Sequence, residues 1–278
     1  MKQMGILTDV TLCIGCEECV KACKSVNETG EDLPWRWQRR VDDLSATRWT
    51  TIVTRPGRHY VRKQCRHCLD PACVSACPVG AMHKTPEGPV VYNSTICLGC
   101  RYCMMACPYG VPRYLWSEPV PYVRKCIMCR DKIMSGELKQ PGCTGACPTG
   151  ATIYGNRDDL LEIAHKRIET KPDLYVPRVF GEHEVGGTSV LYVSDIDLGF
   201  LGWKDDLGDK PLPHETWIYL DKVPYIVGVV GGLMYGIYWI IERRMRLQAE
   251  ATGGVSAPPL ETTSDDKMED ANTETEEK

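Results

Sequence analysis

Sixteen cysteines, arranged as four runs of four, constrain this chain more than any other feature. The runs are, in chain order, Cys13, Cys16, Cys19 and Cys23; Cys65, Cys68, Cys73 and Cys77; Cys97, Cys100, Cys103 and Cys107; and Cys126, Cys129, Cys143 and Cys147. Runs one and three have the C-x2-C-x2-C-x3-C spacing with which bacterial ferredoxins hold [4Fe–4S] clusters. Proline follows the last cysteine of runs two, three and four. Four thiolates per cluster predict four [4Fe–4S] clusters, with all sixteen cysteines as iron ligands.

Two other uses of cysteine fit the pattern less well. Disulfide frameworks belong to short secreted chains, whereas 278 residues are enough to bury a large core. Zinc sites pair C-x2-C units across longer gaps and do not need a third cysteine so close to the second. The spacing therefore favours iron–sulfur clusters over both alternatives.

The ligand sets are predicted from the crossing rule of two-cluster ferredoxins, in which the fourth cysteine of a run binds the neighbouring cluster. The alternative, in which each run closes on its own cluster, stays open at this stage. The crossing rule predicts four sets: Cys13, Cys16 and Cys19 with Cys147; Cys126, Cys129 and Cys143 with Cys23; Cys65, Cys68 and Cys73 with Cys107; and Cys97, Cys100 and Cys103 with Cys77.

Runs two and four contain insertions. Four residues separate Cys68 from Cys73, and thirteen separate Cys129 from Cys143. The longer insertion is expected to form a loop or short hairpin over a cluster. It either meets a partner protein or has no function of its own, and the sequence leaves both readings open.

Basic residues and one histidine lie close to the cysteines. The basic residues either form a solvated rim or compensate the negative charge of the clusters, which would raise their potentials. They are Arg62, Lys63, Arg66, Arg124, Lys125 and Arg130. His67 is expected to be a hydrogen-bonding neighbour of a cluster and not an iron ligand, because cysteines already fill every ligand position.

After Cys147 the sequence predicts an α+β extension. Residues 150–154 read as a short strand, and Asn156 is a candidate N-cap for a helix with acidic residues in its first turn. Residues 185–193 read as a glycine turn followed by a strand. Residues 194–222, rich in Gly, Pro, Asp and Trp, are expected to form an irregular arm.

Residues 224–241 form an eighteen-residue stretch without a charge, which just suffices to cross a bilayer. Gly228, Gly232 and Gly236 share one helix face, a small-xxx-small pattern that lets membrane helices approach closely. The stretch predicts a single transmembrane helix that packs against partner helices. A buried soluble helix is the alternative, although the glycines would weaken one.

The predicted organisation has four parts: a cluster domain (1–154), an extension and arm (155–222), a transmembrane helix (223–242) and a largely disordered acidic tail (243–278). Arg243, Arg244 and Arg246 follow the span and favour a cytoplasmic tail. The first residues show no apolar region of a cleavable signal, so export would require a signal-bearing partner. A net charge of −4 argues against nucleic-acid binding.

The chain resembles the four-cluster iron–sulfur (beta) subunits of the molybdopterin-oxidoreductase (DMSO-reductase) family. Among them it is most similar to the membrane-anchored beta subunit of respiratory formate dehydrogenase and the ferredoxin-like subunit of quinone-reducing nickel–iron hydrogenase. The resemblance spans residues 6–246. It rests on the segments CIGCEECVKAC, QCRHCLDPACVSACPVGA, CLGCRYCMMACPYGVPRY, KCIMCRD, GCTGACPTGA and VGGTSVLYV, followed by one apolar span.

The resemblance implies a fold of tandem ferredoxin-like modules, each with two [4Fe–4S] clusters, plus an irregular extension and one transmembrane helix. It also implies an electron-transfer subunit, anchored in the inner membrane with its clusters on the outer face. Its partners would be a catalytic oxidoreductase subunit and a quinone-reactive or haem b membrane subunit. The sequence shows no nucleophile–base pair or nucleotide-binding fingerprint, so no catalysis by the chain alone is expected. Two alternatives stay open: a cytoplasm-facing reductase subunit with reversed electron flow, and a cluster-bearing sensor or anchor.

Overall fold

The computed structural model describes residues 2–31, 44–55, 59–116, 118–119, 121–201 and 207–252. The chain divides into two compact units, Met1–Tyr219 and Leu220–Lys278. All sixteen cysteines lie in the first unit, and the long apolar segment lies in the second. The finer boundaries expected from the sequence stay a prediction.

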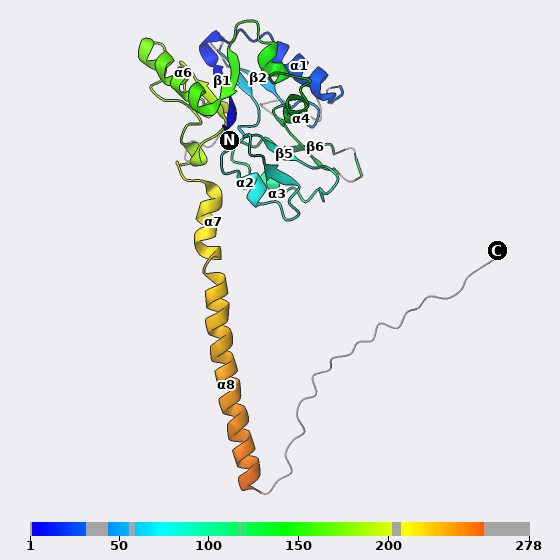
Figure 1. Cartoon of the computed structure of the whole chain (residues 1–278), viewed down its shortest axis with the longest axis vertical. Coiled ribbons are helices and arrows are strands. Elements are labelled where there is room, and N and C mark those ends of the chain that lie inside the picture. The colour runs from blue at the N-terminus through cyan, green and yellow to red at the C-terminus, as the bar shows by residue number, and fades with distance from the viewer. Residues whose placement is uncertain are drawn as a thin grey trace, which may run out of the picture. The chain divides into compact units, whose positions relative to one another are not determined.

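The described elements are short in the first unit and alternate between strands and helices (Figure 1). The strands are β1 (Met4–Asp9), β2 (Thr51–Arg55), β3 (His59–Lys63), β4 (Met82–Lys84), β5 (Val90–Tyr92), β6 (Arg113–Tyr114), β7 (Val123–Arg124), β8 (Thr152–Asn156) and β9 (Val190–Val193). The helices are α1 (Glu18–Asn27), α2 (Ala72–Ser75), α3 (Tyr102–Ala106), α4 (Arg130–Met134), α5 (Gly142–Gly145), α6 (Arg157–Thr170), α7 (Leu212–Leu220) and α8 (Val223–Ala251). The result is a mixed α/β fold with one candidate apolar C-terminal helix.

A three-stranded sheet joins the two ends of the cysteine-bearing region. β1 pairs antiparallel with β8 and parallel with β9, in the order β8-β1-β9. Ile6 and Leu7 are both fully buried because the sheet is covered on both faces. Ile6 faces the cysteine-rich core, and Leu7 packs with Leu160 of α6, which covers the other face (Figure 1). The sheet thereby holds the first and last cysteine runs together.

The third cysteine of every run occupies the same helical position. Each is the second residue of a short helix: Cys19 in α1, Cys73 in α2, Cys103 in α3 and Cys143 in α5. α1 packs against α5, and α2 packs against α3. Runs one and four therefore form one pair of neighbours in space, and runs two and three form another.

The backbone before the second cysteine of every run also has one conformation. The residue at this point adopts a positive φ in all four runs: Gly15, His67, Gly99 and Met128, with φ between 49° and 72°. Glycine tolerates this region freely, whereas His67 and Met128 adopt it at a cost. The four runs thus fold into the same turn although only two of them carry glycine there.

A second repeated turn follows the last cysteine of runs two, three and four. The sequence C-P-x-G places proline second and glycine fourth, a combination typical of a β-turn. Gly80, Gly110 and Gly150 have positive φ, and their N–H groups donate to the carbonyls of the three cysteines. Run one lacks this turn because Cys23 continues inside α1.

Several local predictions are confirmed and others are wrong. A strand and a helix follow Cys147 as expected, and Gly186 and Gly187 form a turn before β9. Asn156 is the N-cap residue of α6, but its side chain makes no capping hydrogen bond. The insertion of run four contains the helix α4 in place of the expected loop or hairpin. The arm predicted as irregular contains α7, a nine-residue helix.

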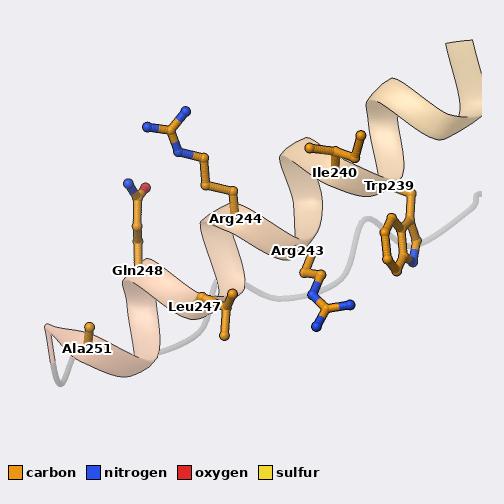
Figure 2. Close-up of a pocket in the computed structure, with 7 residues that line it drawn as sticks. All are labelled: Trp239, Ile240, Arg243, Arg244, Leu247, Gln248 and Ala251. Atoms are coloured by element: carbon orange, nitrogen blue, oxygen red, sulfur yellow. The ribbon is translucent and has the colours of Figure 1, made fainter.

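The second unit consists of α8 and the residues that follow it. The segment from Leu212 to Ala251 is long and apolar enough to span a membrane by length and composition, and no residue of its apolar window is buried. Figure 2 shows the end of α8, where Trp239 and Ile240 give way to Arg243 and Arg244. Arg243 lies over the Trp239 ring at 5.3 Å, as at a boundary between an apolar and an aqueous phase. The predicted disordered tail lies outside the described residues from 253 onward.

Asp9, at the end of β1, anchors the helix-covered face of the sheet. Its carboxylate is fully buried and accepts hydrogen bonds from Arg167 Nη1 at 2.8 Å and Tyr175 Oη at 2.9 Å. It also accepts from the Thr11 hydroxyl at 2.6 Å. α6 and the segment before β9 are therefore tied to β1 by one charged group.

We expect Asp9→Ala to destabilise the fold by about 3 kcal/mol, because the change breaks an ion pair whose carboxylate is fully buried and removes the acceptor to which Arg167 and Tyr175 donate. The measurement is the thermal midpoint by circular dichroism under anaerobic conditions. The control is Glu137→Ala, which removes the partner of Lys132 in an exposed ion pair and should cost less than about 1 kcal/mol. Equal midpoints for the two variants would contradict the assigned role of Asp9.

Candidate metal centre

The folded chain brings the cysteines together in four groups, each of which mixes two runs. Thiols that lie close together raise one another's pKa, and this mutual effect identifies the groups. Cys147 raises the pKa of Cys13, and Cys126 and Cys129 raise that of Cys23. The groups are as follows: group 1, Cys13, Cys16, Cys19 and Cys147; group 2, Cys23, Cys126, Cys129 and Cys143; group 3, Cys65, Cys68, Cys73 and Cys107; group 4, Cys77, Cys97, Cys100 and Cys103. Each group contains three cysteines of one run and the fourth of another.

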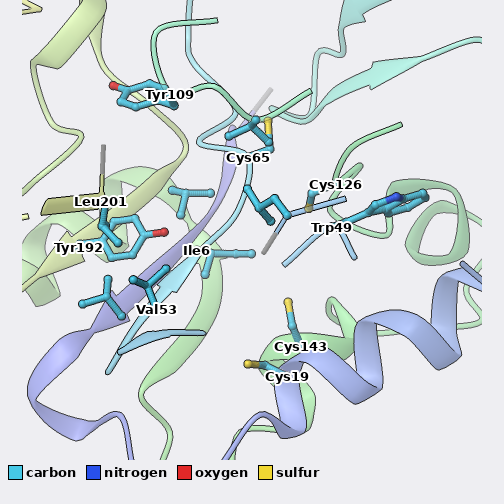
Figure 3. Close-up of a cluster of buried hydrophobic side chains, with 14 of the residues drawn as sticks. Ile6, Cys19, Trp49, Val53, Cys65, Tyr109, Cys126, Cys143, Tyr192 and Leu201 are labelled. Atoms are coloured by element: carbon cyan, nitrogen blue, oxygen red, sulfur yellow. The ribbon is translucent and has the colours of Figure 1, made fainter. Parts of the chain in front are cut away.

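The four groups follow one another in a row. Cys19 of group 1 interacts electrostatically with Cys143 of group 2, and both side chains are labelled in Figure 3. Cys126 of group 2 interacts with Cys65 of group 3, and Cys73 of group 3 with Cys103 of group 4. Sequence order is therefore not spatial order, since the first and fourth runs lie at one end.

Exposure of the thiols changes along this row. All four cysteines of group 2 are buried, and Cys65 of group 3 is buried as well. The exposed cysteines are Cys16 of group 1 and Cys100 of group 4. Large apolar side chains are exposed beside them, with Ile14 next to group 1 and Leu98 next to group 4. The row is shielded in the middle and accessible at both ends.

Burial keeps most of these thiols protonated unless a metal cation binds them. Burial raises the pKa of Cys19 to about 11 and that of Cys73 to about 12. Cys147 is the exception, because hydrogen bonds from Thr149 and nearby backbone N–H groups outweigh its burial and lower its pKa. Iron can bind only the thiolate form, so the energy of iron binding must offset these raised pKa values.

Hydrogen-bond donors are directed at the sulfur atoms. The Tyr114 hydroxyl lies 3.1 Å from Cys103 Sγ, and Asn27 Nδ2 donates to both Cys23 Sγ and Cys129 Sγ at 3.7 Å. The backbone N–H of Met128 donates to Cys126 Sγ at 3.4 Å. Donors of this kind tune the potential of an iron–sulfur cluster, so the surroundings suit thiolate ligands.

Four of the six basic residues named near the cysteines lie in the interior and not in a solvated rim. Arg62, Lys63, Arg66 and Lys125 are all buried. Lys63 Nζ donates to the Leu201 carbonyl at 2.7 Å, and Lys125 Nζ to the Cys126 carbonyl at 2.9 Å. The Arg66 guanidinium lies between the rings of Tyr109 and Tyr192, at 5.1 and 4.7 Å. This placement favours the charge-compensation reading for the buried members of the set.

His67 is fully buried and neutral. Its Nδ1 accepts a hydrogen bond from the Val90 N–H at 2.9 Å, and its Nε2 has no partner among the described residues. Burial, together with the charges of Lys125 and Lys84, holds its pKa well below the usual value. The structure shows the hydrogen bond to the backbone, and the expectation that His67 is a cluster neighbour but not an iron ligand stays a prediction.

No group of three or more His, Cys, Asp or Glu side chains in the described ranges is arranged to hold a single metal ion. The ligands of one zinc ion converge on a common point. The cysteines of a [4Fe–4S] cluster each bind a different iron atom and stand further apart. The donor set, four thiols per group with sulfur-directed N–H groups, fits such a cluster.

Comparison with known proteins agrees with this geometry. Residues 57–157 match the family described as the 4Fe-4S dicluster domain. The chain is 41% identical to a protein of Nitratidesulfovibrio vulgaris, over 88% of this chain and 69% of that one. It is 38% identical to the hydrogenase-2 operon protein HybA of Escherichia coli, over 69% of this chain and 70% of HybA. It is also 37% identical to one subunit of the anaerobic dimethyl sulfoxide reductase of Escherichia coli, over 57% of this chain and 76% of that subunit.

The chain belongs to the iron–sulfur subunits of the DMSO-reductase family. These subunits transfer electrons within oxidoreductase complexes, so the chain is an electron-transfer protein of the 4Fe–4S type. Sequence reasoning identified the cysteines. It missed the sulfur-directed donors Asn27 and Tyr114, which no motif distinguishes from ordinary core residues.

We expect Cys147→Ser to alter the same cluster signal in electron paramagnetic resonance (EPR) as Cys13→Ser, because both residues lie in group 1. Cys143→Ser should alter a different signal, that of group 2, although Cys143 and Cys147 share a run. The measurement is low-temperature EPR of each reduced, anaerobically purified variant, with iron analysis as control. A common signal lost in Cys143→Ser and Cys147→Ser but kept in Cys13→Ser would show that each run closes on its own cluster.

Proposed function

We propose that the chain relays electrons through four [4Fe–4S] clusters, between a catalytic oxidoreductase subunit and a membrane subunit that reacts with quinone or carries haem b. The arrangement of the four cysteine groups in one row, with an exposed cysteine at each end, supports this proposal most strongly. Each cluster, when bound, supplies a centre that takes up and releases one electron. Groups 1 to 4 would each provide the four ligands of one cluster.

The chain's own residues would hold, shield and tune these centres. The buried cysteines of group 2 would keep water from the middle of the relay. Cys16 and Cys100 would lie where electrons enter and leave. We infer that the chain catalyses no substrate reaction by itself and that the catalytic site is on a partner. The names of two relatives, a hydrogenase-2 operon protein and a DMSO reductase subunit, support a partner of either oxidoreductase class.

The row of groups has no built-in direction. A dehydrogenase or hydrogenase partner would send electrons toward the membrane, and a reductase partner would draw them from it. The relative potentials of the partners decide between the two. A cluster-bearing sensor is the alternative of a different class, and clusters that the complex's own substrate cannot reduce would favour it.

The repeated helix and turn geometry of the four runs supports an arrangement of two ferredoxin-like modules. Runs two and three, with groups 3 and 4, would form one module, and runs one and four, with groups 1 and 2, the other. The extension would close the second module through the β8-β1-β9 sheet.

We propose that α8 spans the inner membrane and packs against partner helices. A Cβ at Gly228, Gly232 or Gly236 would meet no described atom within 4 Å, so this face is free for close helix contact. The three arginines after the span favour a cytoplasmic tail, which would put the cluster domain on the outer face.

Sixteen iron atoms per chain are expected, in four clusters of the [4Fe–4S] type. Metal analysis of anaerobically purified protein, combined with quantified EPR of the reduced state, checks this number. Iron near eight per chain, or zinc in stoichiometric amount, would refute the four-cluster relay.

Protease added to intact spheroplasts should cut the cluster domain and spare an epitope placed after Glu261. The expectation follows from the cytoplasmic bias of Arg243, Arg244 and Arg246. Lysed spheroplasts, in which both regions should be cut, are the control. A cut epitope with a protected cluster domain would reverse the topology and favour the cytoplasm-facing reductase subunit.

A further inference from the structure

Arg62 is a cation buried within the cysteine-rich core. It lies in β3 opposite Ile52 of β2, and only 1% of its surface is exposed. Its backbone carbonyl accepts a hydrogen bond from the Tyr192 hydroxyl at 2.8 Å. Its three guanidinium nitrogens have no hydrogen-bond partner among the described residues. A guanidinium is always charged and carries five donors, so its burial is strongly unfavourable unless an anion is close.

The acidic groups that act most strongly on Arg62 are thiols of two cysteine groups, followed by the buried Tyr192 hydroxyl, and the approach of Arg62 to Cys143 falls short of normal hydrogen-bond geometry. Burial lowers the pKa of Arg62, but attraction to Cys143 of group 2 and Cys19 of group 1 outweighs this effect and raises it. In return, Arg62 opposes the burial-driven rise in the pKa of Cys13, Cys19 and Cys23. No carboxylate is among its principal charge partners. Arg62 therefore faces both groups through electrostatic attraction, without a hydrogen bond of normal geometry to either.

The other buried cations differ from Arg62 in this respect. Lys63 and Lys125 donate to backbone carbonyls, and Arg66 stacks on two tyrosine rings. The protein itself satisfies much of their polarity. The Arg62 donors instead match what an iron–sulfur cluster offers, because its thiolate and sulfide sulfurs accept hydrogen bonds and its charge is negative.

We propose that Arg62 is a shared counter-charge for the clusters of groups 1 and 2, which raises the reduction potential of both. The proposal rests on the proposed function, since it requires clusters at these two groups. Reduction adds one negative charge to a cluster, and a fixed cation nearby stabilises the reduced form more than the oxidised form. Because the same guanidinium faces two neighbours, it also offsets the repulsion between electrons on adjacent clusters.

The test compares redox titrations of wild type and Arg62→Gln, followed by EPR in the anaerobically purified complex. Arg62→Gln should lower the reduction potential of two of the four clusters. At a fixed potential, the ratio of oxidised to reduced cluster should rise about tenfold, which is about 59 mV for a one-electron couple. The shifted signals should be those altered by Cys147→Ser and Cys143→Ser. Arg62→Lys, which keeps the charge, should show a smaller shift.

Arg130→Gln is the matched control. It removes the same charge close to Cys129, but Arg130 is 27% exposed and pairs with Glu87 at 3.0 Å. Solvent screens such a pair, so the four potentials should stay within the error of the titration. An equal shift in both variants would mean that net charge, and not the buried position, sets the potentials, and would overturn the proposal.

Iron content separates the possible failures. Wild-type protein with about eight iron atoms would refute the proposed function itself. Arg62→Gln with full iron and four unchanged potentials would refute the role of Arg62 alone. If Arg62→Gln loses iron, Arg62→Lys decides: full iron in this variant shows that a positive charge at this position suffices and supports the role, and loss of iron in this variant too overturns it.

Discussion

The sharing of cysteines between distant runs is the constraint on which the rest of the structure depends. Group 1 joins Cys13 to Cys147, and group 2 joins Cys23 to Cys126, so the clusters proposed at these two groups act as cross-links over more than a hundred residues. Closing loops of this length costs conformational entropy, which metal binding can offset. The β8-β1-β9 sheet closes the same two ends with backbone hydrogen bonds and a buried apolar layer. Folding and cluster assembly are thus expected to be coupled.

Charge is the second requirement, and it follows from the first. Thiols buried deeply enough to exclude water have raised pKa values, and they become ligands only when cations replace their protons. The four anionic clusters proposed for this core would then need charge compensation of their own. Buried Arg62, Lys63, Arg66 and Lys125 meet this need, and an apolar core without clusters would not tolerate them in such number.

The sequence predicted the site better than its surroundings. The sequence prediction of the groups came from the crossing rule of two-cluster ferredoxins, whereas the turn that all four runs share is a finding of the structure, with glycine at Gly15 and Gly99. At His67 and Met128 the rest of the fold imposes the same turn, and the residue type gives no indication of it in the sequence. The helix α7 was missed because Pro213 reads as a breaker, although proline is tolerated in a first helical turn. The burial of Arg62 could not be predicted either. The pattern of apolar and polar residues in the sequence gives no information about the nearby anions that make burial of a guanidinium favourable.

A relay must be insulated in its middle and open at its ends, and the distribution of apolar residues meets both demands. The core around groups 2 and 3 places Cys65, Cys126 and Cys143 among side chains such as Ile6 and Trp49 (Figure 3). At group 4 the apolar side chains turn outward instead, with Leu98, Tyr102 and Met105 exposed around Cys100. Exposed apolar surface at the end of the row is costly for an isolated chain. In the proposed complex a partner would cover it, which would remove water from the terminal cluster and bring the next redox centre close.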